Sequence, residues 1–149
     1  MKFVIYTDGS CLGNPGSGGW SAIIVDCESG EIEELKGGEK YTTNNRMEMT
    51  AAISALKKIP NDSTVELFTD SAYLKNAFTQ NWLVNWKRKG WRNSTGKPVL
   101  NQDLWLELDK LMSTRNVKFK WIKGHLVNVY NERCDEMARD EATKFKNSR

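Results

Sequence analysis

The residues of this chain best suited to chemistry are two aspartates that follow apolar strands. Residues 3–6 are an apolar run of β-branched and aromatic side chains, and the run ends at Asp8 and Gly9. Residues 65–69 repeat this arrangement, because an alternating strand leads directly into Asp70. Two strands that each end in Thr-Asp are expected to place their carboxylates side by side at one edge of a sheet. Hard divalent cations take oxygen ligands from a few converging acids, so the pattern predicts a metal site.

Two further acids occupy apolar faces of predicted helices. Glu48 lies one turn before the apolar stripe of a helix predicted for residues 46–59. Asp135 has the same relation to the stripe of the last helix, predicted for residues 131–146. For Glu48 alone, a favourable interaction with the helix dipole is an equally good explanation. The two strand-end aspartates favour a functional role for both helical acids.

The elements that must position these acids predict an α/β (α+β mixed) fold. Its core is a five-stranded mixed sheet whose first three strands are antiparallel, with helices on both faces. The first strand is expected to be central, between the second and the fourth. The Gly-rich residues 10–19 are interpreted as a hairpin turn, since they lack the Gly-Lys-Ser/Thr ending of a phosphate-binding loop. The other predicted strands are 20–25, 31–40 and 117–122, and the other predicted helices are 71–89 and 100–112.

Four unpaired acids in one place would be unfavourable. Two full charges about 4 Å apart repel by roughly 1–4 kcal/mol, depending on the local dielectric. The sequence pattern places no lysine or arginine to neutralise them. Two divalent ions about 3.5–4 Å apart, held by bridging carboxylates, would resolve the conflict and would support phosphodiester cleavage.

The bulk composition predicts one intracellular domain spanning residues 1–149. A chain of 149 residues can bury a sizeable core without disulfides. Its three cysteines have no metal-binding spacing and form an odd set, which favours a reduced, cytoplasmic protein. No apolar run is long enough for a signal peptide or a membrane span, so no membrane partner is expected.

One segment of the chain is strongly basic. Residues 71–102 contain six lysines and arginines and no acid, so with a net charge of +3 overall the rest of the chain carries −3. Residues 82–98 are expected to form a protruding, tryptophan-bearing handle, because Gly90, Gly96 and Pro98 break the chain there.

Seven segments of the chain, taken in order, form a recognisable set of motifs. They are Asp8-Gly9-Ser10, Asn14-Pro15-Gly16, Thr43-Asn44-Asn45-Arg46-Met47-Glu48, Thr69-Asp70-Ser71, the basic segment, Lys123-Gly124-His125 and Asn131-Glu132-Arg133-Cys134-Asp135. Together these motifs resemble type 1 ribonuclease H of the bacterial kind, and the match runs in order over nearly the whole chain. The resemblance implies the ribonuclease H fold, and endonucleolytic hydrolysis of the RNA strand of an RNA–DNA hybrid to leave 5′-phosphate and 3′-hydroxyl ends.

The resemblance also implies roles for the acids and for the single histidine. Asp8 would bridge two Mg²⁺ ions, for which Mn²⁺ would be a substitute, and Asp135 would complete the site of the attacking water. Glu48 and Asp70 would hold the second ion near the leaving group. His125 would assist proton transfer or product release, although a lone histidine is more often structural.

Substrate contacts are implied in two places, and the protein is expected to act on the hybrid duplex as a monomer. Contacts to 2′-hydroxyls in the minor groove would distinguish RNA from DNA. In the handle, the tryptophans are expected mainly to pack, while the cations face phosphates. The minor-groove residues are Cys11, Asn14, Asn44 and Asn45, the DNA-phosphate pocket is Thr43 with Asn14, and the handle residues are Trp82, Trp86, Lys87, Arg88, Lys89, Trp91 and Arg92.

Two positions depart from the family pattern. Ala72 stands where bacterial relatives often carry a glutamine that touches the substrate. Residues 126–130, after His125, lack the usual small residue and glycine, which predicts a stiffer loop. The remaining alternatives are a junction resolvase or transposase-type nuclease, a non-catalytic hybrid-binding module, and a haloacid-dehalogenase-type phosphatase. The phosphatase would need a second Asp two residues after Asp8, where Ser10 stands.

Overall fold

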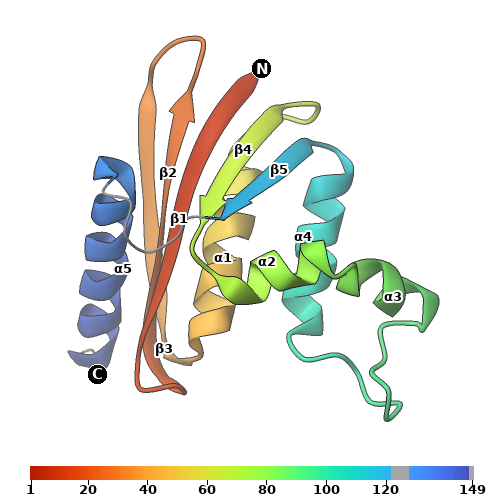
Figure 1. Ribbon diagram of the computed structural model, residues 1–149. Helices are drawn as coiled ribbons and strands as arrows, with labels where there is room; N and C mark the ends of the chain where they lie inside the picture. Colours follow the sequence, from red (N-terminus) through yellow and green to blue (C-terminus); the bar gives the residue numbers. More distant parts are fainter. Residues whose placement is uncertain (122–127, 148–149) are drawn as a thin grey trace.

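The computed structural model describes residues 1–121 and 128–147, and its centre is a five-stranded sheet (Figure 1). The strand order is β3-β2-β1-β4-β5, which confirms that the first strand is central and flanked by the second and fourth. The first three strands are antiparallel, whereas β1 pairs with β4, and β4 with β5, in parallel. The strands are β1 (Lys2–Leu12), β2 (Gly16–Asp26), β3 (Ile32–Thr42), β4 (Thr64–Thr69) and β5 (Asn116–Trp121).

The sequence predicted that the first strand ends at Asp8 and Gly9, but β1 is longer. It continues to Leu12 and stays paired with β2 as far as the Leu12–Ser17 pair. Only its pairing with β4 stops early, at Tyr6 and Phe68. The predicted turn at residues 10–19 is therefore a hairpin, but most of its residues belong to β1 and β2. The sheet opens between β1 and β4 immediately before Asp8.

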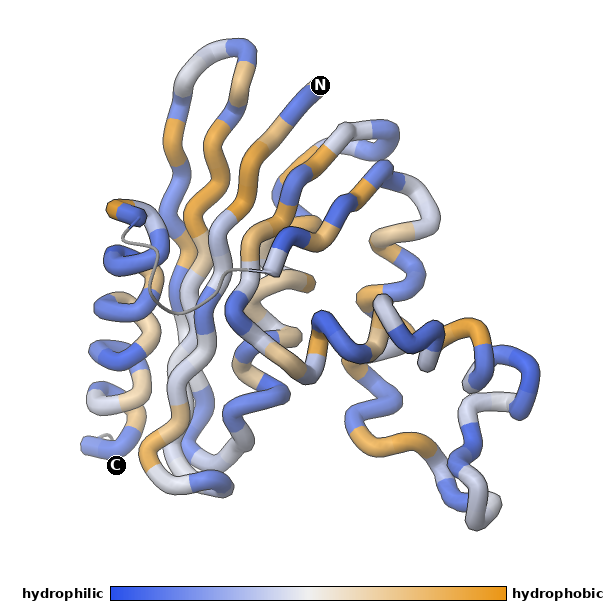
Figure 2. Tube along the Cα trace, viewed as in Figure 1, coloured by the Kyte–Doolittle hydropathy of each residue, from blue (hydrophilic) through white to orange (hydrophobic). Residues whose placement is uncertain are grey.

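Helices cover both faces of the sheet, as predicted. Helix α5 (Val129–Asn147) packs on β1, β2 and β3, and α1 (Asn44–Lys57) packs on the opposite face of the same strands (Figure 1). Helix α4 (Gln102–Ser113) packs against α1. The main apolar core lies between the sheet and α1, and a smaller cluster of Ile23, Cys134 and Met137 lies under α5. Figure 2 shows the apolar stretches of β1 and β2 in the interior and hydrophilic residues on the outer side of α5.

The helix predicted for residues 71–89 is two helices. Helix α2 (Ala72–Thr79) and helix α3 (Trp82–Arg88) are separated at Asn81, which has a left-handed backbone conformation with φ of 57°. Asparagine adopts this conformation more readily than most residues, but it gives a weaker break signal than glycine or proline. Beyond α3, the chain makes a loop that projects away from the body of the protein, as expected for the handle (Figure 1).

Within the described ranges, none of the helices combines the length and the apolar character needed to cross a bilayer.

Candidate metal centre and nucleic-acid interface

Asp8 lies where the two central parallel strands separate. It is two residues beyond Tyr6, the last residue of β1 that pairs with β4. The backbone N–H of Gly9 donates to Asp8 Oδ1 at 2.8 Å, which fixes one carboxylate oxygen. The Asp8 carboxylate is therefore held at the point where β1 and β4 separate.

Glu48 reaches Asp8 because α1 approaches β1 very closely at Gly9. A Cβ atom at Gly9 would lie 2.6 Å from the backbone N of Glu48 and 2.9 Å from the carbonyl C of Met47. Only glycine permits this contact without moving the helix. Thr43 begins the helix, because its Oγ1 accepts from the Arg46 N–H at 3.3 Å. The Gly9 contact then carries the Glu48 carboxylate into the protein interior.

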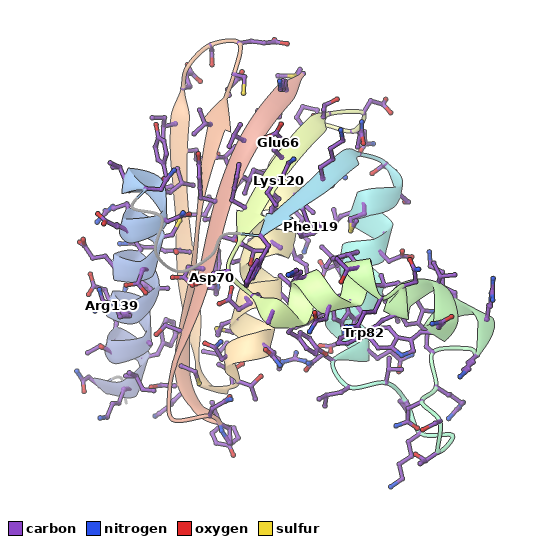
Figure 3. The ribbon with its side chains drawn as sticks, viewed as in Figure 1. Glu66, Asp70, Trp82, Phe119, Lys120 and Arg139 are labelled. Carbon is purple, nitrogen blue, oxygen red and sulfur yellow. The ribbon has the colours of Figure 1, made fainter. Side chains whose placement is uncertain are left out.

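Asp70 completes a group of three carboxylates. It follows β4 directly and precedes Ser71, the N-cap of α2 (Figure 3). One carboxylate oxygen from each of Asp8, Glu48 and Asp70 lies within 4.8 Å of the others. The structure therefore brings together three of the four acids that the sequence singled out.

Burial and mutual repulsion make these acids reluctant to ionise. Burial, followed by the charges of Asp70 and Asp135, raises the pKa of Asp8 from 3.8 to about 7. Burial, and then the charges of Asp8 and Asp70, raise the pKa of Glu48 well above its ordinary value. Burial, and then the charge of Asp135, also raise the pKa of Asp70. In the metal-free protein, the three acids therefore keep their protons to a higher pH than ordinary carboxyl groups do.

The group fits a divalent cation. Glu48 Oε2 is buried and has no hydrogen-bond partner among the described residues. An unpaired buried carboxylate oxygen is costly unless a cation or a donor satisfies it. Asp8, Glu48 and Asp70 supply oxygen ligands only, the donor set that Mg²⁺ and Mn²⁺ prefer.

Asp135 differs in two ways from its prediction. It was expected on the inward side of its helix, but its side chain is 53 % exposed and forms an ion pair with Arg139, with Nε to Oδ2 at 3.0 Å. Its helix buries Cys134, Met137 and Ala138 instead, so Asp135 stands at the margin of the buried stripe. The expectation that no lysine or arginine neutralises the acids was therefore wrong for Asp135, because Arg139 pairs with it. Asp135 still lies close enough to Asp8 to raise the pKa of that residue by charge and by hydrogen bonding.

The predicted histidine, His125, lies outside the described residues. The same holds for Lys123, Gly124, Leu126 and Val127 of the segment around it.

The predicted minor-groove residues gather at the start of α1 and the tip of the β1–β2 hairpin. Asn14 Oδ1 accepts from the Asn44 N–H at 3.1 Å, which ties the hairpin to the helix. The Cys11 thiol donates to the Gly13 and Thr42 carbonyls at 2.8 and 3.4 Å. Asn45 follows Asn44 in the first turn. Cys11, Asn14, Thr43 and Asn44 therefore share one partly exposed surface near Glu48.

The handle tryptophans pack as expected. Trp86 is in contact with Trp82, Trp91 and Trp105, with ring centroids 5.8, 6.2 and 5.5 Å apart. These contacts run from the handle to Trp105, which is fully buried in α4. The tryptophan row fixes α3 to the body of the protein.

The handle cations are not equivalent. Lys87 forms an ion pair with Asp109 on α4, with Nζ to Oδ1 at 2.8 Å, and Arg92 donates to the Gly96 carbonyl at 2.9 Å. Arg88 and Lys89 are exposed and form no ion pair within the part of the chain that the structure describes. Of the four handle cations expected to contact phosphates, these two are therefore the freest to contact an external anion.

Sequence reasoning missed two residues next to Asp70. The indole N–H of Trp121 donates to the Asp70 carbonyl, and the Lys75 ammonium lies over the Trp121 ring. The alternation of residues 117–122 assigned Trp121 to a strand but gave no sign that its side chain returns to β4. Such a contact depends on strand register, which the sequence pattern alone does not determine.

Comparison with known proteins identifies what this arrangement resembles. Residues 1–143 match the RNase H family profile. The chain is 51 % identical over 142 residues to a ribonuclease H of Rhodopseudomonas palustris (strain TIE-1), covering 95 % of this chain and 89 % of that protein.

Two solved structures of RNase H proteins are similar to this chain. LC9-RNase H1, a type 1 RNase H with the type 2 active-site motif, superposes with a TM-score of 0.82 at 28 % identity, covering 96 % of this chain and 72 % of that one. LC11-RNase H1 in complex with RNA/DNA hybrid has the same fold, with a TM-score of 0.68 at 22 % identity over 95 % of this chain and 97 % of that chain.

Proposed function

The chain belongs to the RNase H family, and from that premise we propose that it hydrolyses the RNA strand of RNA–DNA hybrids to leave 5′-phosphate and 3′-hydroxyl ends. Membership of the family makes it a hydrolase with nuclease activity. The observation that carries the proposal is the convergence of three carboxylates, each with a raised pKa, where β1 and β4 separate.

Asp8, Glu48 and Asp70 are proposed as the ligands of Mg²⁺, with Asp135 adding a carboxylate at the exposed margin. Two bound cations would activate a water molecule and stabilise the leaving oxygen of the scissile phosphodiester. The protein's own contribution is to hold acids from β1, α1, β4 and α5 at fixed positions. His125 is proposed to assist proton transfer or product release.

Hybrid recognition is proposed to use the surface of Cys11, Asn14, Thr43, Asn44 and Asn45. Burial raises the pKa of the Cys11 thiol, so this group stays neutral and can donate a hydrogen bond. Such a surface beside the acids suits the wide, shallow minor groove of a hybrid, where 2′-hydroxyls are displayed. LC11-RNase H1, which shares the fold, has been crystallised with an RNA/DNA hybrid, and this supports the proposal.

The test is incubation of the purified protein with end-labelled RNA–DNA hybrid, double-stranded DNA and double-stranded RNA, each with Mg²⁺ or with a chelator. We expect cleavage of the RNA strand of the hybrid only, with Mg²⁺ only. Cleavage of the DNA duplex would favour the resolvase or transposase alternative. Binding of the hybrid without turnover would favour a non-catalytic module, and either outcome would contradict the proposal.

We predict that replacing Lys87, Arg88 and Lys89 together by Ala weakens hybrid binding and flattens its salt dependence. Each phosphate contact contributes about 0.7–0.9 to the slope of log K against log salt, so loss of two or three contacts should lower the slope by about 2. Fluorescence anisotropy with a labelled hybrid over a range of salt concentrations measures this.

The ion pair of Lys87 with Asp109 provides an internal control for the handle. Lys87→Ala alone should change the slope little, whereas Arg88→Ala with Lys89→Ala should reproduce most of the triple variant's effect. An unchanged slope in the triple variant would show that the handle does not contact phosphates.

We further propose that the protein acts as a single-domain monomer in the cytoplasm. The carboxylates of the site all come from one chain, so no second subunit is needed to complete it. Cys11, Cys27 and Cys134 are free thiols, which supports a reducing compartment.

A further inference from the structure

Trp121 makes a hydrogen bond directly to the backbone of a proposed metal ligand. It is the last residue of β5, and its indole Nε1–H donates to the Asp70 carbonyl oxygen at 3.3 Å. Its side chain is partly exposed, at 39 % for the residue, so burial alone does not explain its position. The bond links two strands at the edge where the acids converge.

Among residues 1–121 and 128–147, the Asp70 carbonyl has no backbone partner in the sheet. Pairing between β4 and β5 ends at Thr69 and Trp121, one residue before Asp70. The backbone of Ser71 is held on the other side, since its N–H donates to Thr69 Oγ1 at 3.1 Å and its Oγ accepts from the Leu74 N–H at 3.2 Å. The Trp121 indole therefore fixes the Asp70 carbonyl in the two-residue connection between β4 and α2.

Lys75 holds the indole ring in place. Its ammonium nitrogen lies 3.9 Å from the centroid of the Trp121 ring, a cation–π contact. The Lys75 N–H also donates to the Ser71 carbonyl at 3.1 Å, so the lysine belongs to the first turn of α2, next to Asp70. Lys75 forms no ion pair among residues 1–121 and 128–147, which leaves its charge committed to the ring.

We propose that Trp121 is a positioning residue for the metal centre. Its indole N–H fixes the peptide plane at Asp70, and thereby the direction in which the Asp70 carboxylate meets Asp8 and Glu48. Lys75 supports it by holding the ring. This inference rests on the proposed function, because it takes Asp70 as a ligand of the divalent cation.

The deciding variant is Trp121→Phe, which keeps an aromatic ring for Lys75 but removes the N–H donor. Binding of Mn²⁺ to the substrate-free protein is measured by isothermal titration calorimetry. We expect the dissociation constant for Mn²⁺ to rise about 3- to 10-fold, because the variant loses one hydrogen bond that orients a metal-binding residue, Asp70. The KM for hybrid at saturating metal should stay unchanged, whereas the metal concentration that gives half-maximal kcat should rise.

Trp105→Phe is the matched control. It also removes an indole hydrogen bond, from Trp105 Nε1 to the Tyr73 hydroxyl at 3.1 Å, but from a buried residue of α4 outside the metal centre. It should lower the melting temperature while leaving the dissociation constant for Mn²⁺ within about twofold of wild type. If Trp121→Phe behaves in the same way, Trp121 has a structural role only and the inference is overturned.

Variants of Lys75 test the positioning role while leaving the Trp121 and Asp70 side chains unchanged. Lys75→Met should weaken Mn²⁺ binding by about two- to threefold, and Lys75→Arg should restore it, because guanidinium also forms cation–π contacts. If Trp121→Phe fails to fold, these two variants decide, and identical Mn²⁺ binding in both would overturn the inference.

Failure of the inference can be distinguished from failure of the proposed function. If Asp70→Asn leaves Mn²⁺ binding intact, Asp70 is not a ligand and the proposed function is wrong. If Asp70→Asn weakens binding while Trp121→Phe and Lys75→Met do not, only the positioning role is refuted.

Discussion

Replacing Asp70 by Asn is expected to abolish cleavage of the RNA–DNA hybrid, lowering kcat/KM by about 10³-fold or more. The substitution preserves the shape of the side chain but removes a charged oxygen from a group whose oxygens lie within 4.8 Å of one another. Initial rates on labelled hybrid at saturating Mg²⁺ measure the effect. The same loss is expected for Asp8→Asn, because Asp8 belongs to the same group.

Glu66→Gln is the matched control for Asp70→Asn. Glu66 lies on β4, the strand that Asp70 directly follows, but away from the acids (Figure 3). This variant should retain wild-type activity. Circular dichroism should show that Asp70→Asn is folded, and most of the activity surviving in that folded variant would contradict the assignment of Asp70.

Replacing Asp8 by Asn is expected to stabilise the metal-free protein at pH 8, even though it destroys activity. Asp8 has a pKa of about 7 in the folded protein against 3.8 ordinarily, a difference that corresponds to about 4 kcal/mol of unfavourable ionisation. Because a buried amide carries its own cost, we expect a gain of about 1–3 kcal/mol in the free energy of unfolding. Urea denaturation in the presence of a chelator measures it.

The sign of the effect follows from proton binding. Between about pH 4 and about pH 7, the folded protein keeps a proton on Asp8 that the unfolded chain has released. The folded state therefore binds more protons than the unfolded chain, and the free energy of unfolding falls as the pH rises through this interval. Asp8→Asn should remove most of the decline, although Glu48 and Asp70 shift in the same direction.

Asp103→Asn is a control that should change the stability at pH 8 in the opposite direction to Asp8→Asn. The Arg46 guanidinium, which donates two hydrogen bonds to Asp103, lowers the pKa of this carboxyl. This pairing stabilises the fold above the unfolded pKa of the carboxyl, so Asp103→Asn should lower the stability at pH 8. Stabilisation by both variants would mean that net charge, rather than the acid cluster, controls stability.

Asp8, Glu48 and Asp70 could be found from the sequence because each is a charged residue in an otherwise apolar pattern. Asp8 and Asp70 interrupt apolar strands, and Glu48 interrupts an apolar helical stripe. The strand order was also predictable, since a central first strand follows from short hairpins and right-handed crossovers. All three of these acids meet as expected.

The extent of β1 and β2 could not be predicted, because glycines in β2 look like turn residues. At Gly19, a Cβ would lie 2.1 Å from the Ala138 carbonyl oxygen, so this glycine lets α5 pack on the strand. A strand position that is glycine for a tertiary contact carries the same local signal as a turn. The ion pair of Asp135 with Arg139 has the i,i+4 spacing of neighbours on a helix, so the sequence already contained that signal. The bond from Trp121 to Asp70, in contrast, depends on strand register, which the local pattern does not determine.

The most direct test of the account is the stability of the protein as a function of pH, with a chelator and with saturating Mg²⁺. We predict that the metal-free protein loses stability as the pH rises from about 4 to about 7, and that Mg²⁺ restores it most strongly above about pH 7, where Asp8 is ionised. Contradiction would come from metal-free stability that stays level or rises over this range, or from Mg²⁺ having no effect at any pH. Either result would mean that the acids do not form a cation site.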